Sequence, residues 1–208
     1  MQDLIEYLKD LNSKERFFLV GQVLGNPSFT PAAEFRGKLG GLLEIPIPAD
    51  ALSAMDYHID WLYASLFLAN HSKPNEIYSN ENQVIKAQQE DVDWLIAFKK
   101  QNEYHIVLIE AKGVTGWTNK QMNSKANRLG EIFGEHGDHW IGVVPHFVIM
   151  SPSQPRGLSV KNWPQWMASN GKILWLELSV SEYLTRVCRC TEQGEENRNG
   201  KSWKVVKR

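Results

Sequence analysis

Apolar residues recur every three or four positions along several stretches of the chain, and this spacing predicts helices. The predicted helices cover residues 2–11, 12–23, 32–43, 51–69 and 118–133. Short apolar or alternating runs predict strands at residues 83–88, 146–150, 173–178, 184–190 and 202–206, and a two-stranded hairpin at residues 91–112. From residue 51 the predicted order is helix, strand, strand, strand, helix, strand.

This order predicts an α/β fold, a mixed sheet flanked by helices. The chain has 208 residues, of which 42% are hydrophobic, so it can bury a sizeable core. It shows no internal repeat and no linker that divides it. We therefore predict a single domain over residues 1–208, with a helical extension at 1–50, a core at 51–152 and a C-terminal elaboration with strands at 153–208.

Charge and cysteine content narrow the class of protein. The net charge of −1 removes the simplest argument for a nucleic-acid binder, a strongly basic chain, but local basic patches remain open. Cys188 and Cys190 are too close for an ordinary disulfide and too few for a zinc site, and they suit a strand of a reduced protein. The charged first residues argue against a signal peptide, and the longest apolar run, residues 61–69, is too short to span a bilayer. We expect a cytoplasmic protein without a membrane partner.

The hairpin at residues 91–112 carries the most informative charges. If its strands turn at residues 101–102, Asp93 lies opposite Glu110 and Asp91 lies opposite Lys112. Side chains alternate faces with period two, so all four groups project from one face at one end of the sheet. Three carboxylates and an ammonium group at a strand end suit a divalent cation better than a core.

The triplet Glu110-Ala111-Lys112 is weak on its own, because about one acid-x-lysine triplet is expected by chance in a chain of this length. Its position at the end of an apolar strand, register-matched to an acid, is the stronger signal. The alternative is a pair of surface salt bridges, each contributing about 0–1 kcal/mol. The small residues of the following loop, 113–116, argue against that alternative because they shield acids poorly.

With these residues the sequence resembles the PD-(D/E)xK nuclease superfamily, also called restriction-endonuclease-like, over about residues 51–152. The resemblance implies a core of helix, three strands, helix and strand, with Asp93, Glu110 and Lys112 as the catalytic set. It implies Mg²⁺, with Mn²⁺ as a substitute, held by Asp93, Glu110 and the backbone carbonyl of Ala111. The expected activity is metal-dependent hydrolysis of phosphodiester bonds in nucleic acid, with DNA favoured over RNA. No proline precedes Asp93, which leaves Asp91 as a competitor for its role.

A further metal-binding acid is implied on the first core helix. Asp56 and Asp60 share a face of the predicted helix at residues 51–69, and by position Asp60 is the first choice and Asp56 the second. Glu34, on an earlier helix, is a third candidate. A solvated helix face accounts equally well for Asp56 and Asp60.

Several polar and basic side chains are candidates for contacts with the substrate. Gln121, Lys125 and Arg128 are expected on the outward face of the helix at 118–133, where they could line a phosphate backbone. The basic C-terminal tail, with Trp203 among its cations, could also contact nucleic acid; a hairpin without a partner is as good a reading. A homodimer or a protein partner that supplies specificity stays open. The alternative function is an inactive nuclease-like domain that binds nucleic acid or a protein.

Overall fold

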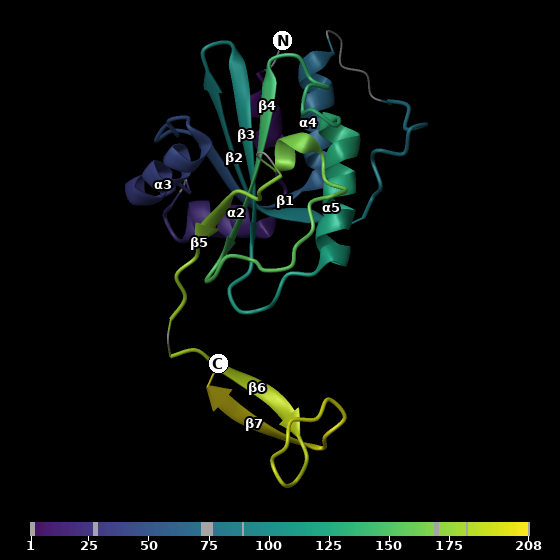
Figure 1. Cartoon of the computed structure of the whole chain (residues 1–208). Helices are drawn as coiled ribbons and strands as arrows, with labels where there is room; N and C mark the ends of the chain where they lie inside the picture. The colour runs from purple at the N-terminus through teal and green to yellow at the C-terminus, as the bar shows by residue number, and fades with distance from the viewer. Residues whose placement is uncertain are drawn as a thin grey trace.

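The fold is a mixed α/β arrangement, seen in a computed structural model that describes residues 3–26, 29–71, 77–88, 90–168, 171–181 and 183–207. Helices pack on a five-stranded sheet, and a second, two-stranded sheet follows near the C-terminus (Figure 1). Arg208, which belongs to the basic tail, lies outside the described residues. No helix in these ranges has the length and apolar content needed to cross a membrane.

The main sheet combines antiparallel and parallel strands. Its strands are β1 (Leu52–His58), β2 (Asp91–Lys100), β3 (Glu103–Ala111), β4 (Val143–Ser151) and β5 (Trp175–Glu177), and they lie side by side in that order. β1, β2 and β3 are antiparallel neighbours, whereas β3, β4 and β5 run parallel. One end of the sheet therefore contains the end of β1, the start of β2 and the ends of β3 and β4. We call this end, across the strands, the sheet edge.

The predicted hairpin register is confirmed. Lys100 pairs with Glu103 across the turn, and the ladder runs in step to Trp94 and Ile109. Gln101 takes a left-handed conformation at φ 55°, which a tight two-residue hairpin turn requires. From Leu95 to Phe98 the side chains alternate between the two faces of the sheet, as expected. Val92, however, packs in the same cluster as Leu95 and Ala97, so the alternation is interrupted near Asp93.

Helices cover both faces of the sheet. One face packs against α1 (Leu4–Asp10), α4 (Ile59–Asn70) and α5 (Asn119–Phe133), with Leu8, Leu62 and Phe133 fully buried. The other face packs against α3 (Ala33–Leu43) through Leu39. Between α1 and α3 lie α2 (Glu15–Phe18) and a π-helical turn, η1 (Leu19–Val23). A 3₁₀ turn, η2 (Gln165–Met167), lies between β4 and β5.

The predicted helix at residues 51–69 is correct only in its second half. Residues 52–58 form β1, and α4 begins at Ile59, where the His58 side chain accepts a hydrogen bond from the Asp60 N–H. The segment has apolar residues that suit either structure, and pairing with β2 buries it. A tertiary contact thus overrides the local helical pattern.

The predicted strand at residues 83–88 is wrong, because this segment is irregular. Its backbone groups bond to side chains in place of a neighbouring strand. The Lys86 and Ala87 N–H groups donate to the Asp60 carboxylate, and the Ile85 N–H donates to Asn80. The first strand of the sheet is therefore β1, which precedes α4.

The C-terminal strands are as predicted. β6 (Thr185–Cys190) and β7 (Ser202–Lys207) pair antiparallel as a sheet of their own. Figure 1 shows this hairpin standing clear of the main sheet. Both cysteines lie on β6 and are free, which agrees with the sequence interpretation.

Candidate active site at the end of the sheet

Acidic residues from three strands line up at the edge where β1 ends and β2 begins. Met55 pairs with Trp94 and Tyr57 with Val92, so the register brings Asp56 opposite Asp93. One step beyond the last β2–β3 pair, Asp93 comes opposite Glu110. Asp56 interrupts β1 with a left-handed φ of 49°, a conformation that aspartate tolerates better than most residues.

The Asp93 carboxylate closes the end of β3. The Ala111 N–H donates to Asp93 Oδ2 at 2.7 Å. At this position β3 therefore bonds to a side chain of β2 and not to its backbone. This contact holds Asp93 beside the Glu110-Ala111-Lys112 triplet, as the hairpin register predicts.

Glu110 is a buried carboxylate with a buried cation as partner. Its side chain is 1% exposed and it bonds to the Lys125 ammonium group of α5, which also donates to the Asp91 carbonyl oxygen. Burial raises the pKa of Glu110 to about 7, the Lys125 charge opposes this, and the Asp93 carboxylate adds to it. Water is excluded from the Glu110 carboxylate, and this favours its protonated form. A second cation placed near Glu110 would favour its ionised form.

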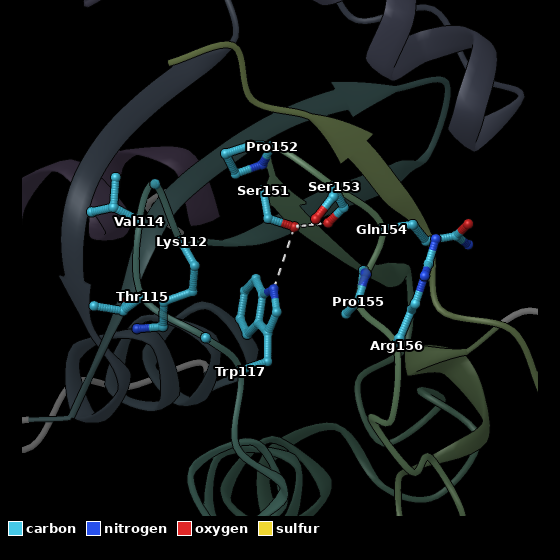
Figure 2. A pocket seen from close by; sticks show the side chains of 12 residues that line it. Lys112, Val114, Thr115, Trp117, Ser151, Pro152, Ser153, Gln154, Pro155 and Arg156 are labelled. Carbon is cyan, nitrogen blue, oxygen red and sulfur yellow. Dashed lines mark hydrogen bonds between the residues drawn. The ribbon is translucent and has the colours of Figure 1, made fainter. Parts of the chain in front are cut away.

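Lys112 lines a groove at the end of the sheet. The Lys112 N–H donates to the Met150 carbonyl at 2.8 Å, which fixes its backbone where β3 leaves the sheet. We call the hollow between residues 112–117 and 151–156 the strand-end groove; its volume is about 860 Å³ (Figure 2). The Lys112 Nζ lies 5.9 Å from the centre of the Trp117 ring, and Arg156 stands on the opposite wall.

A buried serine ties the two walls of the strand-end groove together. The Ser151 hydroxyl oxygen accepts the indole N–H groups of Trp117 at 3.3 Å and Trp175 at 3.1 Å. Its own proton goes to the Ser153 carbonyl at 2.8 Å. Ser151 ends β4, so it links the loop after β3 to the loop after β4. Open sites at the carboxyl ends of parallel strands are common binding places in α/β proteins.

Two cations from the N-terminal region contact the acids at the sheet edge. Lys14 bonds to Asp91 Oδ2 at 2.7 Å, and Arg16, on α2, pairs with Asp56. The Arg16 side chain is 59% exposed, so water competes with its ion pair. The acidic edge is therefore partly neutralised without a metal ion.

The expectation that Lys125 and Arg128 face outward is wrong. They are 5% and 8% exposed, and each pairs with a buried acid: Lys125 with Glu110, Arg128 with Asp60. Helical periodicity places Lys125 and Arg128 outside the apolar face of α5. Their ion pairs with the buried acids Glu110 and Asp60 nevertheless hold both side chains in the interior. Gln121 is exposed in the first turn of α5, as predicted.

The three candidates for a further acid differ in surroundings. Asp60 is occupied by Arg128 and by two backbone N–H groups, which account for both carboxylate oxygens without a metal ion. Glu34 lies on α3 with its side chain 80% exposed and pairs with Lys38 at 2.7 Å. Asp56, the second choice, is the candidate whose register opposes Asp93.

The sheet edge has enough oxygen donors to bind a hard divalent cation. Among the described residues no three His, Cys, Asp or Glu side chains are grouped to hold one ion. Mg²⁺ commonly takes only one or two carboxylates from the protein and keeps several waters. Asp93, Glu110 and the Ala111 carbonyl could meet that smaller requirement. Asp91 Oδ1 is a further buried oxygen, and it has no hydrogen-bond partner within the described part of the chain.

The sequence interpretation missed most of the strand-end groove. Trp117, Ser151 and Arg156 line it, and none of them is among the site residues predicted from the sequence. Ser151 could have been noticed, since it directly follows a predicted buried strand whose end meets the end of β3. Arg156 carries no comparable signal, because it lies in an irregular segment. No protein-family model, curated protein or solved structure matches the chain.

Proposed function

We propose that this protein is a metal-dependent nuclease of the restriction-endonuclease-like type. It hydrolyses phosphodiester bonds of nucleic acid, DNA in preference to RNA, with Asp93, Glu110 and Lys112 as its catalytic set. The observation that carries the proposal is the β2–β3 register. It sets Asp93 beside Glu110, two residues before Lys112, which lines the strand-end groove.

The order of elements supports this fold type in a modified form. The sequence α3, β1, β2, β3, α5, β4 has the helix, three strands, helix and strand of that core, with α4 inserted between β1 and β2. β1 is then the strand before β2, so Asp56 is the acid that the first strand contributes beside Asp93. This reading uses Asp56 in place of Asp60.

Asp93, Glu110 and the Ala111 carbonyl would hold a Mg²⁺ ion, or Mn²⁺ in its place. When bound, the ion supplies positive charge to the phosphate and acidifies a coordinated water. Glu110 would need its ionised form for this, and Lys125 keeps a positive charge at its side to favour that form. Asp93 is held in position by the Ala111 N–H, so it enters the site already oriented.

Lys112 and the strand-end groove would position the substrate. Lys112 presents an ammonium group to the groove, where it can orient the attacking water and offset the charge that develops on the phosphate. Arg156 on the far wall can bind an adjoining phosphate. Trp117 lies between them and donates its indole N–H to Ser151. The groove thus offers charge at both sides and a flat apolar surface between.

The test is cleavage of labelled single- and double-stranded DNA and RNA in Mg²⁺, compared among matched variants. Glu110→Gln and Asp93→Asn keep hydrogen-bond acceptors in place, so the fold should persist while cleavage falls by at least about 100-fold. Lys112→Ala should do the same, whereas Lys172→Ala and Asp50→Asn, both exposed positions elsewhere, should leave activity unchanged. Wild-type activity in all three site variants would refute the proposal and point to a contaminating nuclease.

A second candidate function is a nuclease-like domain that binds nucleic acid or a protein without cleaving. The observation in its favour is that cations of the chain already pair with Glu110, Asp91 and Asp56. The two functions differ in their response to Mg²⁺. A working metal site predicts a rise in melting temperature with Mg²⁺ that disappears in Asp93→Asn, whereas the non-cleaving domain predicts no rise.

A further inference from the structure

The β6–β7 hairpin is a projecting element whose exposed surface the fold of the main sheet does not explain. Its register pairs Arg189 with Trp203, Val187 with Val205 and Thr185 with Lys207. Figure 1 shows it apart from the helices and the five-stranded sheet. A lone two-stranded hairpin is marginally stable in water, so a surface kept on such an element suggests a binding role.

One face of the hairpin carries an open apolar patch. Directly opposed residues share a face of a sheet, so Val187, Trp203 and Val205 lie together, with Arg189 beside Trp203. Trp203 and Val187 are each 68% exposed and Val205 is 56% exposed. An exposed indole next to a guanidinium group is a surface on which a nucleobase can stack.

The hairpin region also carries a net positive charge. Residues 183–208 contain seven Lys and Arg against three Glu, a net charge of +4, so the remaining residues carry −5 to give the overall −1. Such an asymmetry between parts of a chain indicates a polyanionic partner for the basic part. The near-neutral net charge of the whole chain is therefore the sum of a basic hairpin region and an acidic body.

A hollow near the connection between β6 and β7 gathers arginines. Its volume is about 550 Å³, and it is lined by Arg186, Cys188, Arg189, Glu196, Asn197 and Arg198. Glu196 pairs with Arg186 at 2.5 Å, which leaves the hollow positive through Arg189 and Arg198. The Arg189 Nε donates to the Gly200 carbonyl at 2.9 Å, so this guanidinium group is held in place. A fixed guanidinium group suits a phosphate oxygen.

We propose that the β6–β7 hairpin is an arm that binds a nucleic-acid strand, stacking an unpaired base on Trp203 and contacting the adjoining phosphates with Arg189, Arg198 and Lys207. A second copy of the chain, offering its acidic body, is the competing occupant. The nucleic acid is favoured because cations lie on both faces of the hairpin: Arg186 and Lys204 on one, Arg189 and Lys207 on the other. The apolar face of three side chains is also small for a protein interface, which buries about 800 Å² per partner.

This inference does not depend on the proposed catalysis, because binding by the arm needs no metal. The full-length protein is titrated in EDTA against a fluorescent single-stranded oligothymidine and the matching duplex, followed by anisotropy. Trp203→Thr keeps a strand-forming residue but removes the ring, and should weaken single-strand binding roughly 5- to 100-fold. Trp203→Phe should restore most of the affinity, and duplex binding should respond much less.

Charge variants separate phosphate contacts from total charge. Lys207→Ala should reduce the slope of log affinity against log salt by about one, whereas the matched Lys172→Ala on the body should leave the slope unchanged. Glu110→Gln should bind as tightly as the wild type, so a failure of catalysis and a failure of the arm are distinguishable. Amide exchange across β6 and β7 shows whether each variant keeps the hairpin.

Three outcomes would overturn the proposal. They are single-strand binding that Trp203→Thr leaves intact, an equal loss for the duplex and the single strand, and a dimer in sedimentation that Trp203→Thr dissociates. The last would assign the apolar face to a second copy of the chain.

Discussion

At the scale of single residues, Glu110 combines burial with a proposed role in metal binding that requires its charged form. Its folded-state pKa of about 7 lies above the ordinary value of 4.5. In the unfolded chain Glu110 loses its proton first as pH rises, so the folded state binds more protons between these values. Stability supplied by this group is therefore complete below pH 4.5 and is lost as pH rises to about 7.

The raised pKa of Glu110 predicts how the stability of the metal-free protein, measured in EDTA, depends on pH. The free energy of unfolding of the wild type, minus that of Glu110→Gln, should fall by about 3 kcal/mol from pH 4.5 to pH 7 and then level off. Urea unfolding at a series of pH values measures it. A difference that stays flat, or rises with pH, would contradict a raised pKa of Glu110.

Arg128 and Asp60 form the second buried ion pair beneath α5. Arg128→Ala leaves the Asp60 carboxylate buried without its cation, and such a loss costs about 3–5 kcal/mol. We expect a large drop in the urea midpoint but unchanged metal-dependent cleavage in the protein that remains folded. Lys38→Ala, which breaks an exposed pair with Glu34, is the control and should cost less than about 1 kcal/mol. Cleavage lost in a fully folded Arg128→Ala would return Asp60 to the site.

At the scale of elements, Ser151 joins the loops that follow β3 and β4. Ser151→Ala removes the acceptor of two indole N–H groups, which should cost about 1–3 kcal/mol. Amide exchange should rise in residues 112–117 and 151–156 and stay unchanged in the β2–β3 turn. Ser153→Ala is the matched control, because Ser153 takes part through its carbonyl group, which the variant keeps. Equal exchange in the two variants would contradict the linking role of Ser151.

The elements also show what a sequence can predict and why the rest escapes it. The β2–β3 hairpin could be predicted, register included, because its partners are local and a two-residue turn fixes their alignment. β1 could not, because its strand partner lies some forty residues away and its apolar spacing suits a helix equally well. The inward positions of Lys125 and Arg128 depend on acids from β3 and α4, which helical periodicity does not contain.

At the scale of the whole molecule, charge is distributed by position. The acids that line up on β1, β2 and β3 belong to the acidic body, whereas the cations collect on the hairpin that stands apart from it. A polyanion would be repelled by the acidic edge in the absence of a metal ion, and attracted to the arm. An arm that holds the strand would raise its local concentration at the strand-end groove.

This division of labour predicts a dependence on substrate length, which rests on both proposals. Trp203→Thr should raise KM for a long single strand by several fold and leave kcat unchanged, because the arm contributes binding but no chemistry. For a substrate too short to reach from the groove to the arm, the same variant should behave as the wild type. Lys112→Ala should instead lower kcat for both lengths. Steady-state cleavage of the two substrates measures this, and an equal effect of Trp203→Thr on both would show that the arm acts through the fold of the body.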